Sequence, residues 1–263
     1  MAHTEFNLLH AVTLVIAGCT AGIMNAIAGG GTLVSFPTLV WVGLPSIVAN
    51  ATSTIALLPA TAGGTFGYRT KIRSVSRWLK LFAPVSLIGG LLGGILLVQT
   101  PSRVFDSLIP FLLLFATVLF MGQSVFAKIF GVQLTHDRPL SRKWIYGSVA
   151  FQFAVAVYGG YFGAGIGILM LASLGMLGFE DIHEMNTLKV ILGFLINVIA
   201  AVYFIASGLV SWGDALMMSF GAVIGGYGGA HFAQQVSQKK VRTAITLIGL
   251  AISAVMFFRE FSP

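Results

Sequence analysis

The hydrophobic positions of this chain fall in long uninterrupted blocks, without the regular polar alternation of a soluble domain. The stretch from Ala11 to Tyr68 contains no Asp, Glu, Lys, Arg or His, and neither does the stretch from Trp144 to Phe179. A bilayer core needs about 20 apolar residues per helix. Blocks of this length predict an all-α integral membrane protein with several spans. They exclude a soluble enzyme, a nucleic-acid-binding protein and a disulfide scaffold.

Charged and turn-forming residues divide the blocks into ten hydrophobic segments. Two of these segments, 30–43 and 165–178, are short. As helices they would rise only about 21 Å at about 1.5 Å per residue, against a core about 30 Å thick. Whether they cross fully is left open. The ten segments are expected at residues 8–28, 30–43, 46–68, 78–98, 104–127, 144–164, 165–178, 184–207, 212–234 and 241–259.

Composition agrees with this picture and changes the meaning of the net charge. Of 263 residues, 57% are hydrophobic and 9% are charged, whereas a soluble domain has about 25% charged residues. The formal charge of +7 comes mostly from three short loops, at residues 69–80, 128–143 and 239–242. Following the chain, all three fall on one side of the membrane. The positive-inside bias makes that side the cytoplasm, so both termini are predicted to lie outside the cytoplasmic (inner) membrane.

The two halves of the chain repeat a common pattern. Gly89–Gly94 aligns with Gly225–Ala230, and Asn50 aligns with Asn186 at the same offset. We expect these two glycine runs to serve close helix packing. Each half has five segments, and an odd number reverses the direction of the second half. The pattern therefore predicts inverted-topology repeats, a plan common among secondary transporters.

The repeat also defines the expected domain organisation. We assign residues 1–127 to the first transmembrane repeat, 128–143 to a cytoplasmic linker and 144–263 to the second repeat. The alternative is a pair of packed helix bundles with no transport role.

Two glycine clusters interrupt the repeats at corresponding places. Gly29-Gly30-Gly31 precedes the first short segment, and Gly163-Ala164-Gly165 precedes the second. Glycine favours turns and weakens helices, so each cluster predicts a broken or re-entrant hairpin whose turn lies near the membrane centre. A helix that begins there points its free N–H groups and positive dipole end at the centre, which suits an anion. The first three segments carry no acid that would bind a cation.

Polar side chains near the two turns complete the candidate site. Lys189 has two interpretations: it attracts an anion, or it extends to the interface or pairs with Glu184 or Glu180. His183 with Glu184 is a candidate proton carrier, with a solvated loop pair as the alternative. We expect no catalytic residue, metal or cofactor, because motifs for them are missing and Cys19 is the only cysteine. The predicted substrate-binding residues are Asn25, Gly29, Gly30, Gly31, Thr32, Asn50, Thr52, Ser53, Gly163, Gly165, Asn186 and Lys189.

Several of these motifs resemble one known family. Residues 25–32, followed by Phe-Pro-Thr-Leu at 36–39 and Ala-Asn-Ala-Thr-Ser at 49–53, are similar to the sulfite exporter TauE/SafE family, as are residues 159–165 and 185–189. The resemblance covers residues 8–258. It implies an inner-membrane permease for sulfite, sulfoacetate and related anions. The second turn lacks the proline that follows the first, so we expect its hairpin to be less sharply broken.

These observations predict a secondary transporter that moves a small sulfur-containing anion, such as sulfite or an organosulfonate, by alternating access. A small-anion channel and a permease for a neutral polar solute stay open as alternatives. An enzyme is not expected. The expected partners are the anionic substrate and membrane lipid, with no nucleic acid, and a homodimer is left open.

Overall fold

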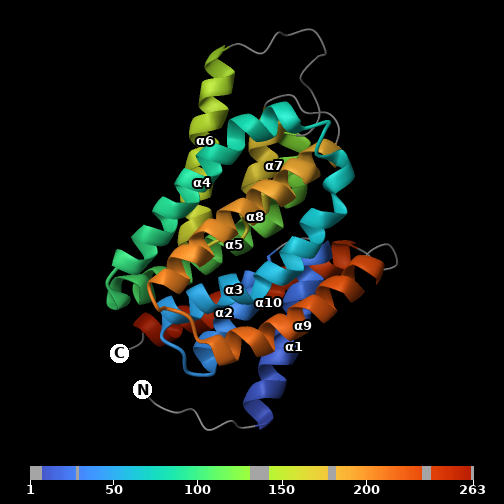
Figure 1. Cartoon of the computed structure of the whole chain (residues 1–263). Helices are drawn as coiled ribbons and strands as arrows, with labels where there is room; N and C mark the ends of the chain where they lie inside the picture. Colours follow the sequence, from blue (N-terminus) through green and yellow to red (C-terminus); the bar gives the residue numbers. More distant parts are fainter. Residues whose placement is uncertain (1–7, 28–29, 131–141, 177–181, 233–237, 262–263) are drawn as a thin grey trace.

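The computed structural model describes residues 8–27, 30–130, 142–176, 182–232 and 238–261 (Figure 1). Within these ranges the chain is helical, and the helices follow the predicted hydrophobic segments. The described elements are α1 (Leu8–Ile27), α2 (Thr32–Trp41), α3 (Ser46–Gly67), the 3-10 turn η1 (Arg69–Lys71), α4 (Ser76–Gln99), α5 (Ser102–Phe130), α6 (Arg142–Tyr161), α7 (Ile166–Met176), α8 (Ile182–Ala206), α9 (Trp212–Phe232) and α10 (Gln238–Phe261).

The helix lengths answer the question about the short segments. α2 has 10 residues and α7 has 11, so at about 1.5 Å per residue each rises only about half of the 30 Å core. Neither helix can cross by itself. α5 continues to Phe130, which makes the first residues of the predicted linker helical.

Four described helices are long and apolar enough to cross a membrane, judged by length and composition. They are the spans Leu8–Ala26, Ser76–Gln99, Ser102–Leu119 and Glu184–Ala206. Large apolar side chains such as Phe111, Phe220 and Phe258 are exposed on the surface. An apolar surface of this kind is typical of helices that face lipid, so the fold is that of an integral membrane protein.

Glycine runs bring pairs of helices into backbone contact. In α4 a Cβ at Gly93 would overlap the carbonyl oxygen of Val157 in α6, and in α9 a Cβ at Gly225 would overlap that of Cys19 in α1. Small residues allow this close approach between membrane helices. The packing role expected for the glycine runs 89–94 and 225–230 is confirmed.

Each half of the chain contributes a helix to the other half. α4 packs on α6 and α8, and α9 packs on α1 and α3. α5 lies against α10 and α3 lies against α8. Figure 1 shows α9 running beside α1 and α3.

The contacts also give the helix directions. Gly221 meets Val15 and Gly229 meets Ile23, so α1 and α9 run parallel. α3 joins them in the same direction, because Ser219 bonds to Ala56 and Gly226 meets Ala60. α4 and α6 also run parallel, since Gly89 meets Ala156 and Gly93 meets Tyr161. The starts of α1, α3 and α9 therefore share one end of the bundle, and α4 begins at the other end.

An aromatic cluster joins α2, α5 and the turn between α6 and α7. The ring centroids of Phe36 and Phe162 are 5.4 Å apart, and those of Phe105 and Tyr161 are 5.7 Å apart. Both pairs meet edge to face, an arrangement that aromatic rings favour. The cluster fixes the first short helix against the second glycine turn.

Candidate functional site

The first glycine turn links α1 to α2 and is held by Asn25. Gly30 has a φ of +89°, a conformation that side chains other than hydrogen rarely allow. The Gly31 N–H donates a hydrogen bond to the Asn25 Oδ1 at 2.8 Å. A Cβ at Gly31 would lie 2.5 Å from the Ala21 carbonyl oxygen. Asn25, Gly30 and Gly31 thus form one unit with the start of α2 at Thr32, while the predicted Gly29 lies outside the described residues.

The second glycine turn links α6 to α7 and uses a different side chain. Gly163 and Gly165 have φ values of +81° and +78°. The Tyr158 hydroxyl donates a hydrogen bond to the Ala164 carbonyl at 2.7 Å. The hairpin is completely broken at residues 162–165, so the expectation of a weaker break was wrong. Two left-handed glycines break the helix without a proline.

Three predicted polar side chains on α3 lie in the interior of the bundle. The Asn50 Nδ2 donates to the Tyr161 carbonyl at 2.9 Å, at the end of α6. The Ser53 and Ser35 hydroxyls share a hydrogen bond at 2.6 Å, which joins α3 to α2. The Thr52 hydroxyl accepts the Ser211 N–H at 3.1 Å. Through the first two contacts, α3 holds both hairpins.

Asn50 keeps one acceptor without a partner among the described residues. Its Oδ1 is buried and makes no hydrogen bond, a property shared in the described part of the chain by the Ser173 hydroxyl. Leaving a buried acceptor unsatisfied costs about 1–3 kcal/mol. The Asn50 Oδ1 therefore offers a place for a hydrogen-bond donor beside the second turn.

Lys189 lies against the first turn of α7. A Cβ at Gly167 would be 3.3 Å from the Lys189 Cδ, and the lysine is partly buried. Across the described residues the single ion pair joins His10 and Asp214, so Lys189 is not paired with Glu184. A cation at a helix N-terminus adds to the positive dipole end. The region around Lys189 and the N-terminus of α7 is therefore electropositive.

For the remaining predicted residues on and before α8, the structure gives fewer contacts. Asn186 precedes Lys189 by three residues on α8, and neighbours at this spacing share a helix face. Asn186 and Glu184 are partly buried. The His183 side chain and Glu180 lie outside the described residues. The structure thus brings Asn50 to the second turn, Lys189 to the start of α7 and Ser53 to α2, whereas Thr52 contacts the α8–α9 loop.

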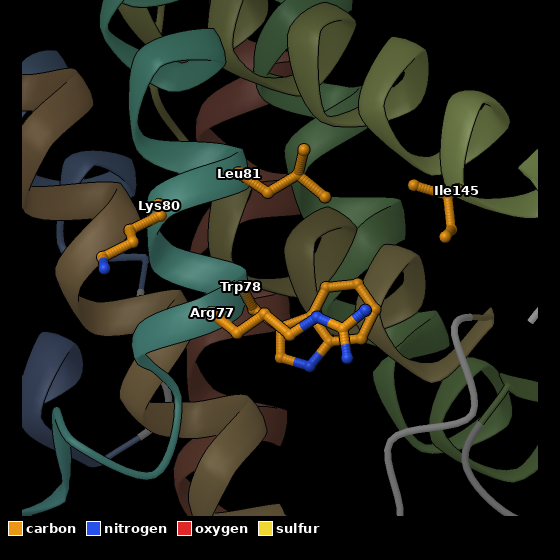
Figure 2. Close-up of a pocket in the computed structure, with 5 residues that line it drawn as sticks. All are labelled: Arg77, Trp78, Lys80, Leu81 and Ile145. Atoms are coloured by element: carbon orange, nitrogen blue, oxygen red, sulfur yellow. The ribbon is translucent and has the colours of Figure 1, made fainter.

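Two surface cavities lie away from these residues. One, of about 610 Å³, is lined by residues at the start of α4 and by Ile145 of α6. Figure 2 shows Arg77 and Trp78 together at this cavity and Lys80 pointing away from Ile145. The other, of about 360 Å³, lies between the end of α2 and the start of α5. Neither is lined by a predicted substrate-binding residue.

The sequence pattern did not identify Tyr158 as the residue that holds the second turn. The available signal was a tyrosine five residues before Gly163 and seven before Gly165, the two glycines of the turn. The contact between Asp214, at the start of α9, and His10 could not be predicted from the sequence, because the two residues are 204 positions apart.

Comparison with known proteins gives a consistent result. A family model described as sulfite exporter TauE/SafE matches residues 14–256. A probable membrane transporter protein of Sinorhizobium is 27% identical over 96% of this chain and 94% of its own length. One from Haemophilus influenzae is 24% identical over 94% of both chains, and YfcA of Escherichia coli K12 is 24% identical over 96% and 94%. No solved structure matches the chain.

Proposed function

The chain belongs to the sulfite exporter TauE/SafE family, and from this membership we propose that it carries small sulfur-containing anions, such as sulfite or organosulfonates, across the cytoplasmic membrane. The family and the names of the relatives make it a membrane transporter. The substrate class, the mechanism and the orientation are the proposed part.

The packing of the helices supports two inverted repeats and alternating access. If the halves are exchanged, the α1–α9 contact becomes the α6–α4 contact, and α3–α9 becomes α8–α4. The α5–α10 and α3–α8 contacts map onto themselves. Inverted repeats allow one half to move against the other around a central site. In this proposal α3 and α8, which carry Asn50 and Lys189, form one of the contacts between the two halves.

The helix directions support the proposed orientation. The α3–α4 loop, with its basic residues, lies at the end of the bundle opposite to the start of α1. Because basic loops favour the cytoplasm, we place the starts of α1, α3 and α9 on the outer side.

The observation that carries the anion specificity is the position of Lys189. Its ammonium has no carboxylate partner among the described residues, and its side chain contacts the first turn of α7. A helix N-terminus contributes about 0.3–1 kcal/mol to binding an anion, and a nearby cation adds to this attraction. A neutral solute would gain less from either charge than an anion does.

Counterflow of labelled substrate in proteoliposomes tests the proposal. The panel is sulfite, sulfate, thiosulfate, sulfoacetate and taurine. We expect saturable counterflow of at least one sulfur-containing anion and a raised KM in Lys189→Gln. Lys80→Gln, an exposed lysine at the start of α4, is the matched control and should leave KM unchanged. Unsaturable flux would indicate a channel, and equal KM values for both variants would remove Lys189 from the site.

A further inference from the structure

His10 and Asp214 form a largely buried pair between two helices from different halves. The His10 Nε2 lies 2.7 Å from the Asp214 Oδ1, and the two side chains are 19% and 12% exposed. His10 is in the first turn of α1 and Asp214 is in the first turn of α9. The parallel packing of these helices brings the pair to one end of the bundle, where it can exchange protons with water.

Hydrogen bonds connect this pair to α3. The Ser211 hydroxyl donates to the Asp214 Oδ2 at 2.6 Å, and the Ser211 N–H donates to the Thr52 hydroxyl at 3.1 Å. Thr52 is completely buried. It lies between Asn50 and Ser53, which hold the second turn and α2. A change in charge at the pair therefore acts on the helix that joins both hairpins.

We propose that His10 and Asp214 form a proton-binding site that couples proton movement to transport. This inference rests on the proposed function, which supplies the transport cycle. Histidine is the side chain whose charge ordinarily changes between about pH 5 and 8. With a neutral imidazole the pair carries one negative charge. Uptake of one proton from water forms one N–H bond and makes the pair a neutral imidazolium–carboxylate pair, and release returns that proton to water.

The geometry goes beyond ordinary helix capping. A serine three residues before an acid at a helix start usually caps that helix by itself. Here one oxygen of the same carboxylate contacts α1, and the serine N–H contacts α3. The protonation state thus changes the charge on one contact that joins α9, from the second half, to α1 and α3, from the first.

Other ionisable groups on the surrounding elements are few. The sequences of α2 and α3, which pack on α1, contain no acidic or basic residue and no histidine. On α1 and α9 the remaining groups are Cys19, Tyr227 and His231, the last two near the end of α9. α10 carries Lys239, Lys240 and Arg242 at its start and Arg259 and Glu260 in its last turn. His3 and Glu5 precede α1. Glu260→Gln is therefore the matched control for Asp214→Asn.

Proton movement and substrate counterflow, measured in the same proteoliposomes, test the inference. A pH-sensitive dye inside the vesicles reports protons when sulfite is added outside. In wild type and Glu260→Gln we expect a sulfite-dependent proton signal. In Asp214→Asn and His10→Asn the sulfite-dependent proton signal should fall about tenfold or more, while sulfite counterflow persists. A change of this size is typical of the coupling between two linked binding sites. His10→Lys, which keeps a positive charge beside Asp214, should show counterflow that does not respond to pH.

A proton signal at the wild-type level in Asp214→Asn would overturn the inference. A Tm far below that of wild type would mark a variant that fails to fold, and His10→Lys would then decide: pH-dependent counterflow in it would also overturn the inference. If wild type moves no sulfur anion, the proposed substrate is wrong. Infrared titration from about pH 5 to 8 then tests the site directly: an imidazole or carboxylate band lost in Asp214→Asn supports it, and an unchanged spectrum refutes it.

Discussion

The side-chain amide of Asn50 donates a hydrogen bond to the backbone carbonyl of Tyr161 at 2.9 Å, across 111 positions of sequence. Tyr161 is the last residue of α6, directly before the second glycine turn. The contact therefore ties α3 of the first half to the hairpin of the second half. It also leaves the Asn50 Oδ1 buried and unpartnered among the described residues, in a position to accept a hydrogen bond.

Replacing Asn50 tests this contact. Asn50→Ala removes one buried hydrogen bond and leaves the Tyr161 carbonyl without its partner, which should reduce stability by about 1–3 kcal/mol. We expect a lower Tm in detergent and slower counterflow. Thr54→Ala, one turn further along α3, removes a hydroxyl that bonds only within its own helix and serves as the control. Equal Tm values for the two variants would show that the Asn50 contact is unimportant.

The first glycine turn should not tolerate a side chain at Gly31. In Gly31→Ala the new Cβ would come within 2.5 Å of the Ala21 carbonyl oxygen, so the end of α1 or the start of α2 must shift. Overpacking of this kind costs about 1–3 kcal/mol. We expect membrane insertion to persist and counterflow to fall. Gly63→Ala, where a Cβ meets open space in α3, should transport normally, and normal transport by Gly31→Ala would contradict a rigid turn.

The second turn depends on the Tyr158 hydroxyl. Tyr158→Phe removes the hydrogen bond to the Ala164 carbonyl and keeps the ring, so we expect a loss of about 1 kcal/mol in stability and reduced transport. Tyr146→Phe changes an exposed tyrosine on the same helix. Thermal unfolding of both variants gives the comparison. If Tyr158→Phe unfolds at the same temperature as Tyr146→Phe, the turn does not need this hydroxyl.

The α4–α6 contact predicts a position-dependent response to alanine. Gly93→Ala would place a methyl group against the Val157 carbonyl and separate the two helices, with an expected loss of about 1–3 kcal/mol. Gly228→Ala, on the open side of α9, should leave the Tm close to that of wild type. Size-exclusion profiles and Tm values in detergent measure the difference. A wild-type profile for Gly93→Ala would argue against the close packing.

The proposed orientation can be tested by labelling. In a Cys19→Ser background, we expect a membrane-impermeant maleimide to label Ser207→Cys in intact cells. Ser74→Cys should react only after the cells are opened. Both serines are exposed, and they lie in the α8–α9 and α3–α4 loops, at opposite ends of the bundle. Labelling of Ser74→Cys in intact cells would place the basic loop outside and reverse the proposed topology.

Length and hydropathy were enough to locate the helices and the two short segments, and the glycine clusters located the two turns. In lipid a segment must satisfy its own backbone hydrogen bonds, so an apolar run of sufficient length forms a helix regardless of its neighbours. Left-handed turns at Gly30 and Gly163 likewise depend on the local absence of a side chain. These features depend on neighbours in sequence, and a sequence records such neighbours directly.

The sequence by itself determined a helical membrane protein with paired hairpins and pointed to Lys189 as an anion-attracting residue. Only the tertiary structure decided that Asn50 contacts the second turn, that Thr52 contacts the α8–α9 loop, and that His10 meets Asp214. These contacts arise because α4 and α9 cross into the opposite halves. Packing between distant segments depends on the shape of the whole bundle, and no local pattern of residues encodes it.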